Sequence, residues 1–171
     1  MEQIHSFPPV LNTHTRVLVI GSMPGIASLQ AQQYYAHKYN QFWPIIFDVF
    51  EAGRPPKNYE DKLCTLLKHR IGLWDTLSAC TRPGSLDSHI QTPVPNDFPA
   101  LFKRYPAVHT LLFNGQAAAT YFKRFYGWQL PGKMLVVLPS TSPAHASLSY
   151  ATKLTRWKKI LLQSLSEKIH T

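Results

Sequence analysis

The stretch Arg16–Gly25, with the sequence RVLVIGSMPG, decides the fold class of this chain. Its first half, RVLVI, is an apolar run of strand length, and the loop GSMPG follows it directly. An unbroken apolar run is typical of a strand in a parallel sheet, because helices cover both faces of such a sheet. The glycines and the proline predict a tight turn whose backbone N–H groups can hold an anion or a water molecule. The turn matches neither the dinucleotide-binding nor the P-loop pattern.

Three more apolar runs of the same kind follow along the chain. We expect strands at Ile71–Leu77, His109–Phe113 and Met134–Leu138. Helical patterns alternate with these strands. The expected helices lie at 41–50, 59–69, 97–105, 116–125 and 147–165. This alternation indicates an α/β fold, a three-layer α/β/α sandwich around a four-stranded parallel central sheet.

Two further expectations concern the connection before the third strand. Residues 82–95 are rich in Pro, Gly, Ser and Asp, which predicts a long surface loop. Loops of that length are often functional. Asn96 follows, and its side chain is of the type that caps the first turn of a helix.

Polar clusters stand at the carboxyl end of every expected strand. In chain order they are GSMPG, WDTL, FNG and PSTSPAH. The carboxyl ends of parallel strands meet at one edge of the sheet, and ligands bind there in open α/β folds. The sequence therefore predicts that the four clusters converge on one site.

Length and charge narrow the class of protein. The 171 residues suit a single domain, 1–171, in which 1–15 form an N-terminal extension that packs on or precedes the core. Eighteen Lys and Arg against nine acidic residues give a net charge of +9, which favours a polyanionic partner such as nucleic acid. A merely basic protein without such a partner is the alternative.

Cysteine content and hydropathy argue against several other classes. Cys64 and Cys80 are too far apart for a CxxC motif and too few for an iron–sulfur cluster, so we expect two reduced, mostly buried thiols and no metal site. No segment is long and apolar enough to span a membrane, and the N-terminus does not resemble a signal peptide. We therefore expect an intracellular, cytoplasmic protein.

An aromatic cluster, YYAHKYNQFW, occupies residues 34–43. Phe42 and Trp43 begin the first expected helix and are predicted to lie in the core. The three tyrosines precede that helix, where rings are less needed for packing. Aromatic faces in a loop beside a basic surface suit stacking on nucleic-acid bases. The three are Tyr34, Tyr35 and Tyr39.

The ordered series GSMPG, SL, YYAH, NxFW, GLWD, FNG and PSTSPAH resembles the hypoxanthine-DNA glycosylase branch of the uracil-DNA glycosylase superfamily. The similarity extends from about Arg16 to about Trp157. It implies a monofunctional DNA glycosylase, a monomer without cofactor, that flips a deaminated base out of double-stranded DNA and hydrolyses its N-glycosidic bond. Hypoxanthine is the favoured base, and uracil or xanthine remain open.

The resemblance assigns the attacking water to two motifs. GSMPG is similar to the superfamily's first motif, so Gly21, Ser22 and Met23 are implied to lie beneath the sugar. The mismatch-uracil branch has a water-binding asparagine in place of Met23, and a thioether cannot do that work. In the hypoxanthine branch this asparagine lies in NxFW, which implies Asn40. A side-chain amide can accept from water and orient it. The alternative for Asn40 is an N-cap on the following helix.

Three residues are implied to contact the flipped base. Tyr35 matches the aromatic that stacks on it. Asp75 falls where related enzymes contact the base edge, and a carboxylate there could accept from N1–H of hypoxanthine. The alternative for Asp75 is a helix cap or a loop carboxylate. Asn114 is a weaker candidate, because Asn-Gly is also common in turns.

The motif PSTSPAH is similar to the loop that contacts the DNA backbone and fills the gap left by the flipped base. Serines and backbone N–H groups suit phosphate contacts. The DNA-binding residues implied are Pro139, Ser140, Ser142, Ala144 and His145. His145 could also be an exposed loop histidine without a role. Two departures from the family pattern are Lys38, where relatives usually have proline, and the absence of a leucine wedge.

Other functions remain open on the sequence. A nucleoside hydrolase acting on free nucleosides is one, and a catalytically inactive DNA-binding protein of the same fold is another. A serine hydrolase fits poorly, because no GxSxG motif is present. The basic residues of the last helix could contact DNA or form an ordinary solvated face. They are Lys153, Arg156, Lys158 and Lys159.

Overall fold

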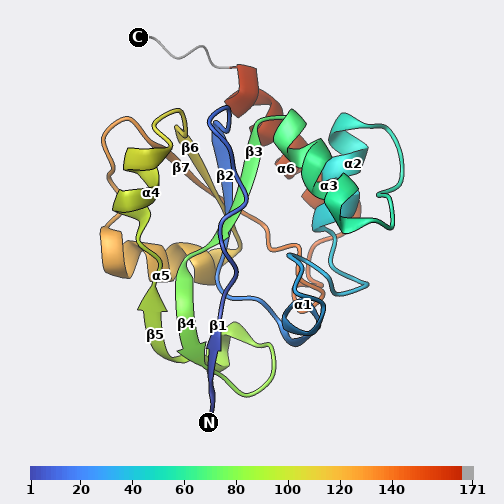
Figure 1. Ribbon diagram of the computed structural model, residues 1–171. Coiled ribbons are helices and arrows are strands. Elements are labelled where there is room, and N and C mark those ends of the chain that lie inside the picture. The colour runs from blue at the N-terminus through green and yellow to red at the C-terminus, as the bar shows by residue number, and fades with distance from the viewer. Residues whose placement is uncertain (167–171) are drawn as a thin grey trace.

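The computed structural model describes residues 1–166. Within them, a parallel sheet of four strands has the order β3-β2-β6-β7 (Figure 1). The strands are β2 (Val17–Gly21), β3 (Ile71–Asp75), β6 (Thr110–Asn114) and β7 (Met134–Leu138). β2 is flanked by β3 and β6, and its last residue, Gly21, pairs with Asp75. The four carboxyl ends are therefore level with one another at one edge, as predicted.

Helices cover both faces of this sheet and confirm the three-layer α/β/α sandwich. Side chains of β2 alternate between two cores, so that Val17 and Val19 pack toward Trp157, while Leu18 and Ile20 pack toward Phe122. The first face carries α2 (Phe42–Phe50), α3 (Tyr59–Lys68) and α6 (Tyr150–Ser166). The second carries α4 (Phe98–Arg104) and α5 (Gln116–Tyr126).

A second, antiparallel sheet was not predicted. It has the order β1-β4-β5, with β1 (Gln3–His5), β4 (Leu77–Thr81) and β5 (Gln91–Pro95). The run IGLWDTL, expected as one strand, is divided at Thr76, whose N–H donates to the Gly21 carbonyl at 2.7 Å. The chain leaves the parallel sheet there and enters the second sheet. β1 and β5 are short and mostly solvent-facing, so they lack the apolar runs that revealed the central strands.

The expectation that residues 82–95 form one long surface loop was therefore wrong for the part that forms regular structure. The segment contains a short 3-10 helix, η1 (Asp87–His89), and the strand β5. Pro93 and Pro95, in the middle and at the end of β5, made this segment resemble a loop, although an edge strand is a place in a sheet where proline is tolerated. The capping prediction for Asn96 was also wrong. Asp97 caps α4 by accepting from Ala100 N at 3.1 Å, whereas Asn96 donates to the Asp75 carbonyl at 2.8 Å.

Smaller differences concern segment ends. A short helix, α1 (Ile26–Ala31), follows the GSMPG turn. The last helix begins at Tyr150 rather than Ser147. Residues 1–15 contact both sheets, through β1 and through a bridge from Val10 to Leu73. No helix in the described part of the chain is long and apolar enough to cross a membrane.

Candidate active site

A cavity of about 270 Å³ lies at the carboxyl edge of the parallel sheet. The chain crosses from β3, on one side of β2, to β6 on the other, and such a switch point leaves a crevice beyond the strand ends. Residues following all four strands line the cavity, so the predicted convergence occurs. Its sequence-predicted members are Gly21, Ser22, Met23, Tyr35, Asn40, Asp75, Asn114, Ser140, Ser142 and Ala144.

Asp75 forms a buried, polar part of this cavity. The residue is 4% exposed, and its Oδ2 has no hydrogen-bond partner in the described chain. Burial, with a smaller contribution from the charge of the nearby Asp87, raises the pKa of the Asp75 carboxyl to about 7, and Arg82 opposes the shift. A buried carboxyl without a partner is costly in its charged form. Asp75 therefore offers a titratable group to a ligand in the cavity.

Gly21 leaves the space that Asp75 occupies. A Cβ at Gly21 would lie 2.5 Å from Asp75 Oδ1 and 3.4 Å from the Tyr35 hydroxyl. The glycine is required here for close approach, and not for its backbone conformation. Gly21, Tyr35 and Asp75 are far apart in the sequence. They can meet at one point because Gly21 has no side chain.

Gly21→Ala is expected to lower the free energy of unfolding by roughly 1–3 kcal/mol, because the new methyl overpacks a closed contact. Denaturant unfolding measures the change. Gly53→Ala is the matched control, since a Cβ at Gly53 would meet only the Glu51 carbonyl at 3.7 Å, an ordinary contact. Equal stability of the Gly21 variant and the wild type would contradict the described packing.

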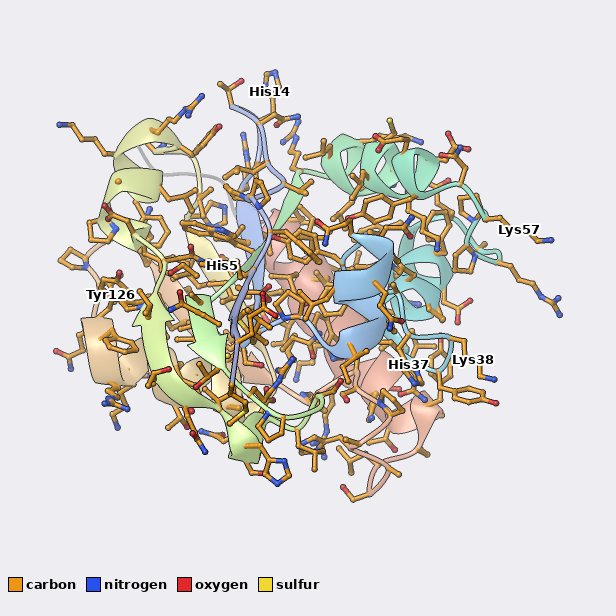
Figure 2. The ribbon with its side chains drawn as sticks, turned by 60° about the horizontal axis from the view of Figure 1, so that its bottom comes forward. His5, His14, His37, Lys38, Lys57 and Tyr126 are labelled. Carbon is orange, nitrogen blue, oxygen red and sulfur yellow. The ribbon has the colours of Figure 1, made fainter. Side chains whose placement is uncertain are left out.

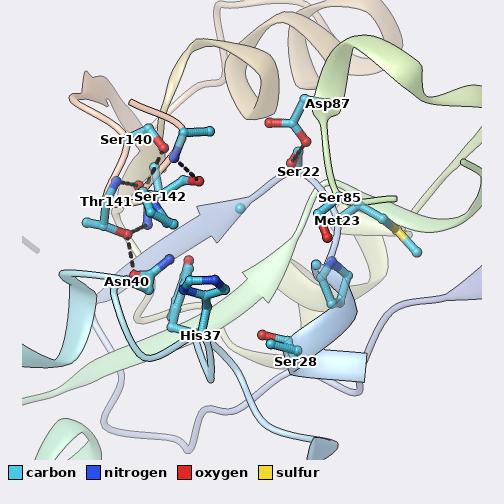
Figure 3. Close-up of a pocket in the computed structure, with 18 of the residues that line it drawn as sticks. Ser22, Met23, Ser28, His37, Asn40, Ser85, Asp87, Ser140, Thr141 and Ser142 are labelled. Atoms are coloured by element: carbon cyan, nitrogen blue, oxygen red, sulfur yellow. Dashed lines mark hydrogen bonds between the residues drawn. The ribbon is translucent and has the colours of Figure 1, made fainter. Parts of the chain in front are cut away.

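Asn40 is held on the cavity wall by two hydrogen bonds to its side-chain oxygen. Oδ1 accepts from Phe42 N at 3.0 Å and from Thr141 Oγ1 at 2.9 Å, which occupies both of its lone pairs. The capping alternative is wrong, because Gln41 is the N-cap residue of α2; Asn40 precedes it and bonds to the first residue of the helix. The Nδ2 amide, however, has no protein partner within residues 1–166. Figure 3 shows the side chain at the cavity with its bond to Thr141.

Thr141 joins three loops, and sequence reasoning missed it. Its N–H donates to Asn114 Oδ1 at 2.9 Å, and its hydroxyl accepts from Asn114 Nδ2 at 2.9 Å. Its carbonyl accepts from Gln41 N at 3.0 Å. Asn114 therefore serves first to fasten the loop after β7 to the end of β6. The only sequence signal was the position of Thr141 inside PSTSPAH.

Ser22 and Met23 lie on the opposite side of the cavity from Asn40 (Figure 3). Ser22 Oγ donates to Asp87 Oδ1 at 2.6 Å, and within residues 1–166 no histidine or lysine is bonded to this hydroxyl. The Met23 side chain packs with Leu77 and Cys80 and points away from Asn40. Ser22 and Met23 line the cavity, but Ser22 is bonded to Asp87 and Met23 packs in an apolar cluster.

The segment after β4 closes this side of the cavity, which sequence reasoning also missed. Arg82 is buried and donates to the carbonyls of Pro24 and Gly84. Ser85 Oγ accepts from Ile26 N at 2.8 Å. These bonds fasten the segment over the GSMPG turn, and they place three additional residues in the cavity wall. The three are Ser85, Leu86 and Asp87.

Comparison with known proteins decides the family. A model of the uracil DNA glycosylase superfamily matches residues 8–166. The chain belongs to the uracil DNA glycosylase superfamily. A Methanosarcina acetivorans protein named hypoxanthine DNA glycosylase is 36% identical over 154 residues, which cover 90% of this chain and 95% of that protein. A Methanosarcina barkeri protein of the same name is 36% identical over 115 residues, 67% of this chain and 73% of that one.

A solved structure agrees with the family assignment. The solution NMR structure of a candidate uracil DNA glycosylase from Methanosarcina acetivorans superposes with a TM-score of 0.80 at 34% identity. The match covers 95% of this chain and 99% of that one. The family inferred from the ordered motifs and the predicted fold class are both confirmed.

The tyrosines of this superfamily member have three different environments. Tyr34 is 4% exposed, and its hydroxyl donates to the Pro8 carbonyl at 2.9 Å, so the prediction that it is a loop ring available for stacking was wrong. Tyr35 lines the cavity in a left-handed conformation, φ 57°, with its ring 4.2 Å from that of Phe42. Such strain in a non-glycine residue often marks a functional position. Tyr39 is exposed.

The loop after β7 is compact and is bonded to its own side chains. Ser140 Oγ accepts from Ser142 N at 3.2 Å, and Ser142 Oγ accepts from Ala144 N at 3.3 Å. Pro139 accepts from the indole N–H of Trp157 at 2.9 Å. His145 does not line the main cavity. It lies instead in an adjacent groove against α6, where its carbonyl accepts from Lys153 Nζ.

Proposed function

We propose that this chain hydrolyses the N-glycosidic bond of hypoxanthine in double-stranded DNA. The observation that carries the proposal is the buried, unpartnered carboxyl of Asp75 in the same cavity as the free amide of Asn40. The carboxyl of Asp75 can form hydrogen bonds with the edge of a base, and the amide of Asn40 can hold a water molecule beside the sugar. The names of the two Methanosarcina relatives support hypoxanthine as the base.

Access to this cavity requires base flipping. A base inside a duplex cannot reach a group as buried as Asp75, so the nucleotide must rotate out at a cost of a few kcal/mol. The cavity volume of about 270 Å³ lies just below that of pockets for drug-sized ligands, which measure roughly 300–1,000 Å³, and so favours a single base. A mispaired inosine flips more easily than a paired base, which contributes to selectivity.

Asp75 is suited to a lactam edge, the adjacent N–H and C=O of a base. A neutral carboxyl accepts from N1–H of hypoxanthine through its carbonyl oxygen and donates its O–H to O6. As the bond from C1′ to N9 breaks, its electron pair moves onto the base. A donor aimed at O6 stabilises that charge. Uracil and xanthine also have lactam edges, so both remain substrates to be tested.

Asn40 and Tyr35 complete the proposed mechanism. With Oδ1 occupied, the Nδ2 amide of Asn40 donates to the water and holds it toward C1′. The water attacks C1′ as the sugar acquires oxocarbenium character. Its oxygen becomes the C1′ hydroxyl, and the proton that it loses to solvent is balanced by the proton that the departing hypoxanthine anion takes up. Tyr35 contacts the face of the flipped base. No lysine lines the cavity within the described chain, which supports hydrolysis by water in a monofunctional enzyme.

The proposal is tested with duplexes that carry one inosine or one uracil. Alkaline treatment converts each abasic product to a strand break. Breaks at inosine support the proposal, whereas breaks only at uracil would reassign the base. Release of hypoxanthine from free deoxyinosine but not from duplex would identify a nucleoside hydrolase. Binding without cleavage would identify an inactive DNA-binding protein.

The basic residues of the groove against α6 lead to a separate prediction about DNA affinity. Arg156 and Lys159 line it beside the loop after β7, whereas Lys158 does not. Arg156→Ala and Lys159→Ala are each expected to reduce the slope of log K against log[salt] by roughly one, the effect of losing one phosphate contact. Binding titrations at several salt concentrations measure the slope. Lys158→Ala is the control, and an equal effect of all three would indicate a diffuse charge effect.

A further inference from the structure

We propose that Tyr39 fills the gap left in the DNA duplex when the target base enters the cavity, an inference that rests on the proposed function. Flipping removes one base from the stack and exposes the faces of its neighbours. An inserted side chain restores contact with those faces and holds the open state. In this chain, Tyr39 has the exposure, position and chemistry for that work.

The fold does not use the ring of Tyr39. It is 64% exposed, and among residues 1–166 it is the only exposed aromatic side chain. Its ring contacts are two neighbours in sequence, with the His37 ring centroid at 5.8 Å and Lys38 Nζ at 4.8 Å. Figure 2 shows His37 and Lys38 together at the surface. A large ring held in solvent between basic groups suits contact with a nucleic acid.

The turn that carries Tyr39 is fixed to the cavity. Asn40 N donates to the His37 carbonyl at 2.9 Å, and Tyr39 N donates to His37 Nδ1 at 3.2 Å. His37 lines the cavity, and Asn40 is bonded to Thr141 of the loop after β7. Tyr39 is therefore one residue from the proposed water-binding amide, at the rim through which a flipped nucleotide must pass.

The tip of the loop after β7, Pro143 and Ala144, is exposed but has no aromatic ring that could cover the face of a base. His145 follows and is also exposed, but it lies in the groove against α6 and does not line the cavity. An aromatic ring can, and stacking of this kind contributes roughly 1–3 kcal/mol per base. Lys38, beside Tyr39, carries a positive charge toward the same surface. In this proposal, the loop after β7 contacts the DNA backbone, and the turn that carries Tyr39 inserts the ring. The bond between Thr141 and Asn40 joins the two.

Leu86 is the competing candidate for this role. It is 49% exposed and lines the cavity from the segment after β4. Figure 3 shows its neighbours Ser85 and Asp87 across the cavity from His37 and Asn40. An aliphatic side chain can wedge between bases but lacks an aromatic face for stacking on them. Comparison of variants at Tyr39 and Leu86 therefore decides which of the two side chains fills the gap.

The test compares Tyr39→Ala, Tyr39→Phe and Leu86→Ala on three inosine substrates. These are an ordinary duplex, a duplex with a pyrene nucleotide opposite inosine, and a single strand. Tyr39→Ala is expected to excise hypoxanthine from the ordinary duplex roughly ten- to a hundredfold more slowly, the equivalent of the lost stacking. Pyrene occupies the gap itself and should restore the rate, and Tyr39→Phe should resemble the wild type. Any loss with Leu86→Ala should be smaller than with Tyr39→Ala and should not be restored by pyrene, because Leu86 lines the cavity rather than the gap.

Several outcomes would overturn the inference. They are an unchanged rate for Tyr39→Ala on the ordinary duplex, a loss that pyrene does not restore, or a larger loss for Leu86→Ala. Unchanged thermal unfolding of Tyr39→Ala shows that a loss of rate is not a folding defect. A wild-type chain that cleaves none of the substrates overturns the proposed function as well, and that result differs from failure of the Tyr39 variant alone.

Discussion

Asn40→Ala is expected to slow excision of hypoxanthine from an inosine duplex by roughly a hundredfold to a thousandfold. This is the usual effect of removing one preorganised polar group that acts in the transition state. The Nδ2 amide is the part of Asn40 that no protein group occupies, so its loss releases the attacking water. Single-turnover assays under alkaline quench measure the change.

Asn40→Ala also removes the two bonds to Oδ1, so a second variant must separate structure from chemistry. Asn40→Asp keeps an oxygen for Phe42 N and Thr141 Oγ1 but loses the N–H donor. We expect it to retain the stability of the wild type and to lose activity as Asn40→Ala does. A fully active Asn40→Asp enzyme would show that the amide N–H does not hold the water.

The second large effect concerns Asp75 and pH. We expect kcat/KM for inosine excision to fall as pH rises through about 7, the pKa to which burial raises the Asp75 carboxyl. The neutral acid can donate to O6 as negative charge develops on the base, whereas the carboxylate repels that charge. Asp75→Asn keeps a donor and an acceptor at nearly the same positions without titrating, so its profile should be flat.

The opposite profile would assign the other role to Asp75. If kcat/KM rises through about 7 and Asp75→Asn is inactive, the ionised carboxylate accepts from N1–H and the neutral acid is not the active form. Asp75→Leu, which has neither donor nor acceptor, should be inactive on either account. The profile therefore distinguishes the two protonation states by the direction of its slope.

The same shift has a consequence for stability. Because the pKa of Asp75 is higher in the folded chain than its ordinary value of 3.8, the folded state binds this proton more tightly than the unfolded state. The contribution to stability is fully present below the ordinary value and is lost as pH rises through about 7. Asp75→Asn should thus resemble the wild type at low pH and have the higher Tm above neutrality.

The central sheet could be predicted because its strands are buried on both faces. Burial requires unbroken apolar sequence, as in RVLVI and HTLLF, and that pattern is visible in a single chain. The second sheet has edge strands such as QIH and QTPVP, which face solvent and contain proline. Nothing local distinguishes them from loops, since pairing with β4 determines their conformation.

The site could be predicted as far as topology determines it. Gly21, Asp75 and Asn114 end neighbouring strands, so the parallel sheet alone brings them together. Thr141 and Ser85 depend on contacts between loops, and loop contacts follow from no periodic pattern. The prediction that Tyr34 is free to stack was wrong because residues 7 and 8 cover it, and the sequence does not show where that segment folds.

The measurement that tests this account most directly is alkaline strand cleavage of a duplex with one inosine, by the wild type and by Asn40→Ala. The account predicts breaks at inosine with the wild type and their near-complete loss with the variant. Breaks of equal yield with both proteins would show that Asn40 does not act in hydrolysis. An uncut inosine duplex, with the wild type folded and bound to DNA, would contradict the proposed function.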